Sequence, residues 1–169
     1  MAASQHILVV VRHAKAEQVG ATDFERVLTD RGRADAAATG RWLAEAGVRP
    51  DRALVSSAPR AAQTWQSMAE GAGWSLGADL DPGLYSAGPD TALDLVRELD
   101  EGTDSAVIVG HNPTMAVLAQ LLDDSEGDVE AGNAMAAGFP TSAAAVFEVD
   151  GEWADLQSAR LTGFHVGRG

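Results

Sequence analysis

Histidine and arginine side chains follow three apolar segments of this sequence. Arg12 and His13 come directly after the first apolar run, and His111 follows a later one after a single glycine. Arg60 lies a few residues beyond a third apolar segment. In an open α/β sheet, ligands bind outside the carboxyl ends of the strands. We therefore expect these four side chains to meet at one edge of a sheet.

Such a cluster suits a phosphoryl group, whose charged oxygens require fixed positive charge and hydrogen-bond donors. Arg12 and Arg60 supply forked donors that match phosphate geometry. An imidazole held at one nitrogen by a backbone carbonyl can attack phosphorus with its other nitrogen. These properties favour His13 as a nucleophile and His111 as a hydrogen-bond donor to a phosphoryl oxygen. Asn112 is expected to begin a helix whose N–H groups help to bind the substrate.

The same residue types permit two other sites, which their surroundings disfavour. A zinc ion could bind His13 and His111 with a carboxylate, but the neighbouring arginines repel a cation and no clustered ligand spacing is present. Ser56 or Ser57 could be a nucleophile, but the sequence has no Gly-x-Ser-x-Gly segment, so helix capping is the better interpretation. We expect no metal and no cofactor.

Composition and charge restrict the class of protein. The chain of 169 residues is 46% hydrophobic, which predicts one globular domain over residues 1–169. Its net charge of −13 disfavours nucleic acid and anionic membranes as partners. The absence of cysteine excludes a thiolate nucleophile. The sequence has no signal-peptide pattern and no apolar run near the ~20 residues of a membrane span, so we expect a cytoplasmic protein.

The elements that must position these side chains follow from the apolar patterns. Short apolar runs predict strands at 7–11, 53–55, 75–80 and 106–109. Helical periodicity predicts helices at 30–46, 58–72, 91–99 and 113–122, the first capped by Thr29 and the second by Ser56 or Ser57. Asp150-Gly151 indicates a hairpin between 142–149 and 153–161, whereas 123–141 and the tail after Thr162 are expected to be flexible. This alternation predicts a three-layer α/β sandwich: a mostly parallel mixed sheet, helices on both faces and a C-terminal hairpin.

Taken in order, these segments resemble the histidine phosphatase superfamily, whose fold is phosphoglycerate-mutase-like. Its Arg-His-Gly signature corresponds to residues 12–14, and its Leu-Thr-x-x-Gly segment to residues 28–32. Its Ser-x-x-x-Arg-Ala-x-Gln-Thr segment corresponds to residues 56–64, and its Gly-His pair to residues 110–111. The short chain is most similar to the bacterial phosphohistidine phosphatases of the SixA type.

The resemblance implies a phosphatase in which His13 is transiently phosphorylated. Arg12, Arg60 and His111 would hold the phosphoryl group. Arg26 matches a further basic residue of the SixA type that faces the pocket, although an exposed loop arginine is an equal alternative. The implied substrate is phosphohistidine on a partner protein. A phosphatase of a small phosphorylated metabolite and a non-catalytic phosphate-binding module remain as alternatives.

The chain departs from the family at two places. Ala14 replaces the glycine of the signature, which would cause strain if this position required a positive φ. The glutamate that serves the mutases as a general acid has no counterpart here, and Glu17, Asp79 and Asp81 are the candidates. A phosphohistidine substrate leaves as an imidazole and could dispense with the acid.

Overall fold

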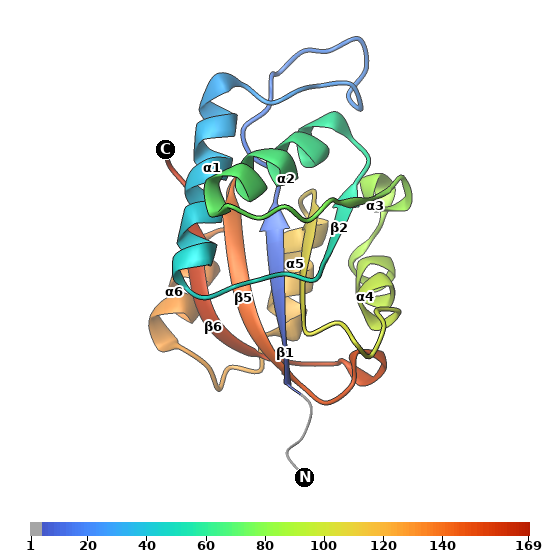
Figure 1. Cartoon of the computed structure of the whole chain (residues 1–169), viewed down its shortest axis with the longest axis vertical. Coiled ribbons are helices and arrows are strands. Elements are labelled where there is room, and N and C mark those ends of the chain that lie inside the picture. The colour runs from blue at the N-terminus through green and yellow to red at the C-terminus, as the bar shows by residue number, and fades with distance from the viewer. Residues whose placement is uncertain (1–4) are drawn as a thin grey trace.

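Six strands form one mixed sheet at the centre of the molecule (Figure 1). The computed structural model describes residues 5–169, and the sheet has the strand order β3-β2-β4-β1-β5-β6. The strands are β1 (Gln5–Arg12), β2 (Arg52–Ser56), β3 (Asp79–Asp81), β4 (Ser105–Gly110), β5 (Ala143–Asp150) and β6 (Arg160–Val166). The first four are parallel to one another, and β5 runs antiparallel to both β1 and β6.

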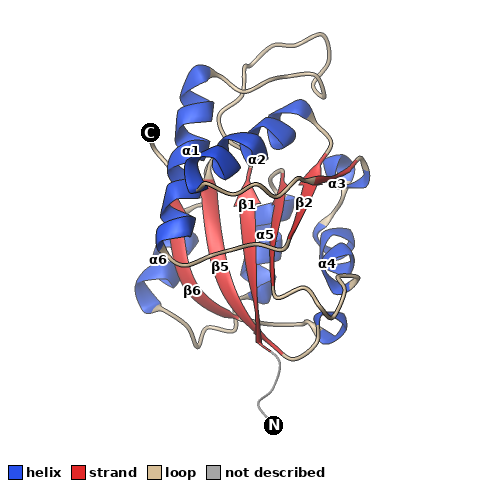
Figure 2. Ribbon diagram, viewed as in Figure 1, coloured by secondary structure: helices blue, strands red, loops and turns tan. Residues whose placement is uncertain are grey.

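Helices cover both faces of this sheet. Figure 2 shows two helices in front of the strands and α5 behind them. The front pair is α1 (Asp30–Glu45) and α2 (Pro59–Ala72), and the other face carries α4 (Pro89–Arg97), α5 (Thr114–Leu122) and α6 (Val129–Ala137). A short helix, α3 (Gly83–Ser86), and a 3-10 turn, η1 (Trp153–Asp155), complete the described elements. The predicted three-layer sandwich is confirmed.

The central strands form because their side chains are buried on both faces of the sheet. Leu8, Val9, Val10 and Val11 have no exposed surface, and their alternate side chains enter two separate cores. Branched residues of this kind pack well on a pleated surface that is covered on both sides. The apolar runs at 7–11 and 106–109 therefore mark two neighbouring parallel strands, β1 and β4. The run at 53–55 falls within β2, whereas the strand predicted at 75–80 is wrong over 75–78 and only its end belongs to β3.

Helices α1 and α2 approach closely because glycine occupies their contact. A Cβ atom at Gly40 would overlap the backbone oxygen of Met68, and a Cβ atom at Gly71 would overlap that of Ala37. Ala34 and Ala46 are exposed, although the helical periodicity of this segment would place both on its apolar side. The side of α1 that is buried instead consists of Gly32, Asp35, Ala36, Thr39, Gly40 and Leu43.

Two segments expected to be flexible are ordered. Residues 129–137 form α6, because the Asp128 side chain caps it by accepting a hydrogen bond from Ala131 N (2.8 Å) and alanine then favours the helix. The tail continues as β6, and Gly169 N donates to Asp35 Oδ1 (3.0 Å). The hairpin is confirmed as an antiparallel pair, but its second strand begins only at Arg160. The intervening η1 turn buries Trp153, whose indole donates to Thr103 O (2.9 Å).

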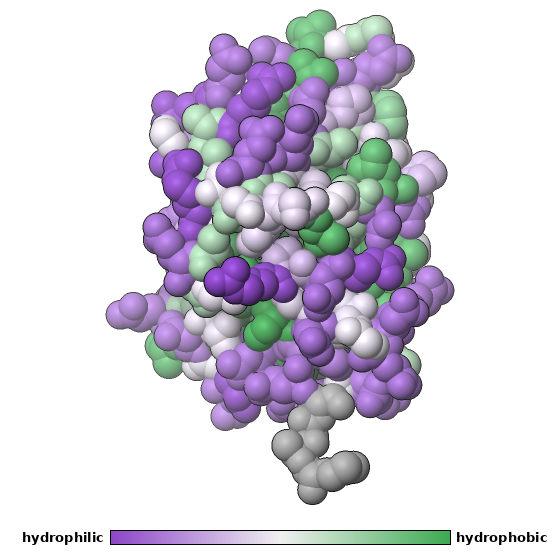
Figure 3. Space-filling model, in the orientation of Figure 1, coloured by the Kyte–Doolittle hydropathy of each residue, from purple (hydrophilic) through white to green (hydrophobic). Residues whose placement is uncertain are grey.

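The exterior agrees with the acidic composition. Most of the face in Figure 3 is hydrophilic, with smaller hydrophobic areas between the polar side chains. Of the helices within residues 5–169, none has the length and apolar character that crossing a membrane requires.

Candidate active site

The parallel pairing of β1 with β4 brings the two predicted histidines together. Arg12 pairs with Gly110 in the register, and His13 N donates to Gly110 O (3.0 Å). The His13 and His111 rings follow directly, with their centroids 5.2 Å apart. Two segments nearly a hundred residues apart therefore place their imidazoles side by side at the carboxyl edge of the sheet.

A cavity of about 390 Å³ opens at this edge. The first turn of α2 brings Arg60 to it, and this side chain is almost completely buried. All six residues predicted for the site line the cavity, together with other polar side chains; the six are Arg12, His13, Arg26, Arg60, His111 and Asn112. The structure therefore assembles the complete set that the sequence analysis named.

Hydrogen bonds explain why the sequence segments around this cavity occur together. Thr64 Oγ1 accepts from Ala14 N (2.9 Å) and donates to Arg60 O (2.7 Å), so one hydroxyl connects the histidine loop to α2. Gln63 Oε1 accepts from Leu28 N (2.8 Å) and connects α2 to the segment before α1. These neighbouring side chains on α2 fix the loops on either side of the cavity.

The signature position occupied by Ala14 carries no strain. The only non-glycine residues with positive φ within the described chain are Ser125 and Ser142. Ala14 is completely buried, and its N–H is bonded to Thr64. An alanine therefore fits this position as well as a glycine.

His13 is held in the orientation that a nitrogen nucleophile requires. Its Nδ1 lies 2.7 Å from Ala14 O, so Nδ1–H donates to this carbonyl and Nε2 keeps its lone pair. Burial lowers the pKa of His13 to about 3, with smaller contributions from His111, Arg60 and Arg12, while the bond to Ala14 acts in the opposite direction. The imidazole is therefore neutral at neutral pH.

His111 is held by Ser56, at the end of β2. Its Nε2 lies 2.8 Å from Ser56 Oγ, which itself accepts from Ala58 N (3.2 Å). The Ser56 hydroxyl can therefore donate to Nε2, which leaves His111 Nδ1 protonated. Burial, and then Arg60, lower the pKa of His111 to about 4.

The predicted serine cap of α2 is wrong, since the helix begins after Ala58 without a side-chain cap.

Three buried nitrogen atoms at the cavity have no hydrogen-bond partner within residues 5–169. They are Arg12 Nε, Arg60 Nε and His111 Nδ1. Buried polar groups are normally hydrogen-bonded, so three unpaired nitrogens on residues that line one cavity mark a polar site rather than ordinary packing.

Asp23 is a cavity residue that the sequence analysis did not identify. Its Oδ2 accepts from Tyr85 Oη (2.6 Å) and from Arg60 (3.2 Å), and its Oδ1 accepts from Arg26 (2.8 Å). The bonds from Tyr85 and Arg26 hold the pKa of the Asp23 carboxyl well below its usual range. The Tyr85 ring meets the His111 ring edge-on, with centroids 5.5 Å apart. No local pattern identifies Asp23, because its partners come from distant segments.

Asn112 and Arg12 share one backbone acceptor. Asn112 Nδ2 donates to Phe139 O (2.8 Å), and Arg12 donates to the same oxygen (3.3 Å). The other end of the Asn112 amide accepts from Ala116 N (3.2 Å), as expected of a residue at the start of α5. Both ends of the amide are therefore engaged within the protein.

The three carboxylates considered as general acids lie away from the cavity. Glu17 is exposed and does not line it. Asp79 pairs with Arg52 (2.6 Å), and Asp81 Oδ1 accepts from Gly83 N (2.8 Å). Asp23 is the one carboxylate among the residues that line the cavity.

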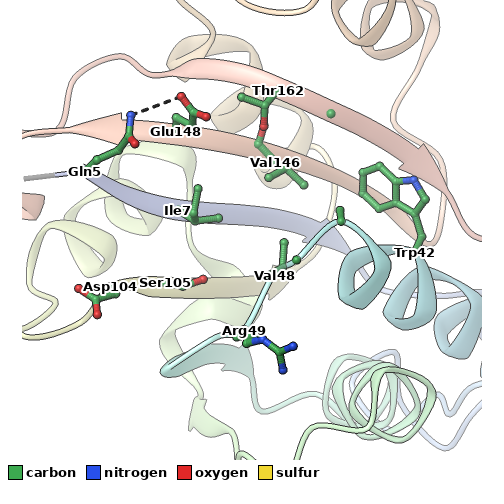
Figure 4. A pocket seen from close by; sticks show the side chains of 13 residues that line it. Gln5, Ile7, Trp42, Val48, Arg49, Asp104, Ser105, Val146, Glu148 and Thr162 are labelled. Carbon is green, nitrogen blue, oxygen red and sulfur yellow. Dashed lines mark hydrogen bonds between the residues drawn. The ribbon is translucent and has the colours of Figure 1, made fainter.

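A larger hollow, of about 550 Å³, lies at the opposite end of the parallel strands (Figure 4). Trp42 and Val48 face Ile7 and Val146 across it. It contains none of the residues predicted for the site.

In the part of the chain that the structure describes, histidine and acidic side chains form no group of three or more that could hold a metal ion.

Comparisons with known proteins agree with this geometry. The family model of the histidine phosphatase superfamily (branch 1) matches residues 8–86. An uncharacterized protein of Mycobacterium tuberculosis is 36% identical over 162 residues, which cover 94% of this chain and 100% of that protein.

Two solved structures are similar over nearly the whole chain. A candidate phosphohistidine phosphatase SixA from Nakamurella multipartitia has a TM-score of 0.86 and 28% identity, over 99% of both chains. A candidate phosphohistidine phosphatase SixA from Agrobacterium tumefaciens has a TM-score of 0.77 and 31% identity, over 95% of this chain and 98% of that one. The chain belongs to the histidine phosphatase superfamily.

Proposed function

We propose that the protein is a phosphatase that removes the phosphoryl group from phosphohistidine on a partner protein, through a phosphorylated His13. The cavity supports this proposal because a neutral imidazole stands next to two arginines. The similarity to two structures described as candidate SixA phosphatases supports the same substrate class.

The proposed reaction has two displacements. His13 Nε2 attacks phosphorus, and the bond from phosphorus to the substrate imidazole breaks. The leaving ring takes the bonding electrons and departs as a neutral imidazole, because its other nitrogen carries a proton. Water then attacks the phosphorus on His13, loses a proton to solvent and releases inorganic phosphate. In both steps Arg12, Arg60 and His111 would donate hydrogen bonds to the phosphoryl oxygens, whose charge they stabilise.

The state of Asp23 is the observation that carries the choice of substrate. It is the carboxylate at the cavity, and the hydrogen bonds that it accepts from Tyr85, Arg60 and Arg26 favour its ionised form, so it is a poor proton donor to a leaving group. An alcohol leaves as an alkoxide, whose conjugate acid resembles water with a pKa of about 15.7, and needs a proton donor. A substrate ring whose other nitrogen is protonated leaves as a neutral imidazole, whose conjugate acid has a pKa near 6.5, and is a far better leaving group without that help.

The remaining cavity residues would support the substrate. Arg26 bonds Asp23 and also donates from Nε to Glu17 O (2.7 Å), so we propose that it steadies the loop beside the phosphoryl group. Asn112 is predicted from the sequence to bind substrate. Because both ends of its amide are engaged, we propose that it acts by holding Phe139 O and the start of α5.

A substrate comparison tests this function. The purified protein is incubated with a phosphohistidine peptide and with a panel of alkyl and sugar phosphates, and kcat/KM is measured for each. We expect phosphohistidine to be the best substrate, a phosphate that is acid-labile and base-stable to appear on His13, and His13→Ala to be inactive. A higher kcat/KM for an alkyl phosphate would favour the small-metabolite alternative. Full turnover by His13→Ala would remove His13 from the mechanism.

A further inference from the structure

The cavity carries more positive charge than one phosphoryl group requires. Arg12, Lys15, Arg26 and Arg60 line it against the single carboxylate of Asp23, which gives the lining a net charge of +3. A phosphoryl group brings about −1.5 to −2 at neutral pH. The chain as a whole has a net charge of −13, so this excess is confined to the site.

Lys15 differs from the other cations of the cavity. It is the only lysine in the sequence, and its side chain is exposed at the cavity. Arg26 and Arg60 are both paired with Asp23, at 2.8 and 3.2 Å, and the half-buried Arg12 donates to Phe139 O (3.3 Å). Lys15 forms no salt bridge with any residue in the described range and is the exposed member of the four. Its ammonium group therefore remains free to bind an anion from outside the protein.

The backbone of Lys15 is fixed against the first turn of α1. Its carbonyl oxygen accepts from Thr29 N (3.0 Å) and from Thr29 Oγ1 (3.3 Å). Gly32 permits this contact, because a Cβ atom at that position would overlap the Lys15 carbonyl oxygen. Lys15 and His13 are two residues apart, so their Cα atoms are separated by at most roughly 7 Å. Both residues line the same cavity, so an anion bound by Lys15 can lie beside a phosphoryl group at His13.

We propose that Lys15 makes the site selective for substrates that carry a second negatively charged group next to the phosphoryl group. The inference rests on the proposed function, and in a protein substrate the second group is the carboxylate of an Asp or Glu residue near the phosphohistidine. Lys15 is then a specificity-determining residue that acts on substrate binding, because its charge is placed outside the group of donors around His13.

Two peptides and four proteins test this selectivity. The peptides carry one phosphohistidine and differ only by Asp or Asn at the neighbouring position. The proteins are the wild type, Lys15→Met, Lys15→Arg and Arg41→Met. Arg41 is an exposed residue of α1 that does not line the cavity, so its replacement removes the same charge elsewhere. Both kcat and KM are measured for each pair, at low and high salt.

We expect the wild type to favour the acidic peptide by roughly twofold to fivefold in kcat/KM, the effect of an exposed ion pair, and to do so through KM. Lys15→Met should abolish the preference, whereas Lys15→Arg and Arg41→Met should keep it. High salt should reduce it, because salt screens exposed charges.

Each contrary result has a distinct meaning. Equal hydrolysis of both peptides by the wild type would overturn the role of Lys15 and leave the phosphohistidine phosphatase standing. A preference that survives in Lys15→Met, or an equal loss of kcat on both peptides, would overturn it as well. Hydrolysis of neither peptide, with alkyl phosphates hydrolysed, would overturn both proposals.

Discussion

Arg60 has two kinds of partner in this site. Its terminal nitrogens donate to Asp23, to the backbone oxygen at 2.8 Å and to Oδ2 at 3.2 Å, while its buried Nε has no partner within residues 5–169. The Tyr85 ring lies against the same guanidinium, 5.7 Å from its carbon to the ring centroid. Asp23 and Tyr85 therefore orient the arginine at the edge of the cavity.

Removal of this guanidinium should slow the reaction strongly. We expect Arg60→Ala to lower kcat/KM by roughly 10²-fold or more, as found for the loss of a donor that binds developing charge. Arg60→Lys should not restore it, because an ammonium group lacks the forked geometry. Steady-state kinetics with a phosphohistidine peptide measures both variants. A loss below about threefold would place Arg60 outside the reacting group.

Histidines whose pKa is lowered in the folded protein make stability depend on pH, with His13 and His111 shifted most and His165 in the same direction. In the folded protein the pKa is lowered to about 3 for His13 and about 4 for His111. Both bind protons near pH 6.5 when unfolded, so below that pH the unfolded state takes up protons that the folded state refuses. The free energy of unfolding should therefore fall as the pH decreases from 6.5 towards 4, by up to about 1.4 kcal/mol per pH unit for each histidine.

Urea unfolding at pH 7.5 and at pH 5 measures this loss. The lowered pKa of Asp23 affects stability only at a pH low enough to protonate the carboxyl group of the unfolded chain, which begins near its ordinary pKa of about 3.9. It therefore contributes little between pH 7.5 and pH 5. His13→Asn should remove about half of the loss, and the double variant with His111→Asn most of it. An identical loss in the double variant would assign the pH dependence to other groups.

At the scale of elements, the sequence predicted those parts of the fold that depend on local patterns. The strands β1 and β4 follow from unbroken apolar runs. Thr29 was predicted to cap α1, and its side chain does so by accepting a hydrogen bond from Gly32 N (2.9 Å). The first turn of α2 could also be expected, because Pro59 is suited to that position. These signals need no knowledge of distant residues.

The parts that were missed depend on contacts between distant segments. Ser56 is a good helix cap by type, but burial at the end of β2 turns its hydroxyl to His111. Asp23 lies in a loop without periodicity, and Tyr85 meets it from 62 residues away. Arg12, His13, Arg60 and His111 were predicted to converge because strand ends share an edge, whereas no comparable rule identifies Asp23 or Tyr85.

The contact between α1 and α2 gives a prediction with an internal control. Gly40→Ala should lower the free energy of unfolding by about 1–3 kcal/mol, because the new Cβ atom meets the Met68 carbonyl oxygen. Gly132 lies inside α6, where an added Cβ atom would have no neighbour within 4 Å, so Gly132→Ala should raise stability by about 0.5–1 kcal/mol. Chemical denaturation measures both. If Gly40→Ala raised the stability as much as Gly132→Ala, the two helices would have to separate at no cost in free energy.

At the scale of the whole molecule, the cavity differs in charge from the chain as a whole. The chain has a net charge of −13, yet four cations line the cavity at the carboxyl edge of its parallel strands. A substrate anion must approach through the distant negative field and is then attracted locally. At physiological ionic strength, salt screens charges over about 8–10 Å, so it weakens both the distant repulsion and the local attraction. These two changes have opposite effects on substrate binding and partly cancel.

This arrangement predicts activity without a divalent cation and inhibition by oxyanions. Arg12 and Arg60 already supply the positive charge that a metal would bring, and they repel a cation from the same position. Activity should therefore be unchanged in EDTA, and tungstate or vanadate should compete with the substrate by binding the same donors. Raising the salt concentration should change kcat/KM only modestly, in contrast to the steep loss shown by nucleic-acid-binding proteins. Assays with and without EDTA, at several concentrations of salt and tungstate, measure all three effects. Loss of activity in EDTA that zinc or magnesium restores would assign His13 and His111 to a metal instead of to phosphoryl transfer.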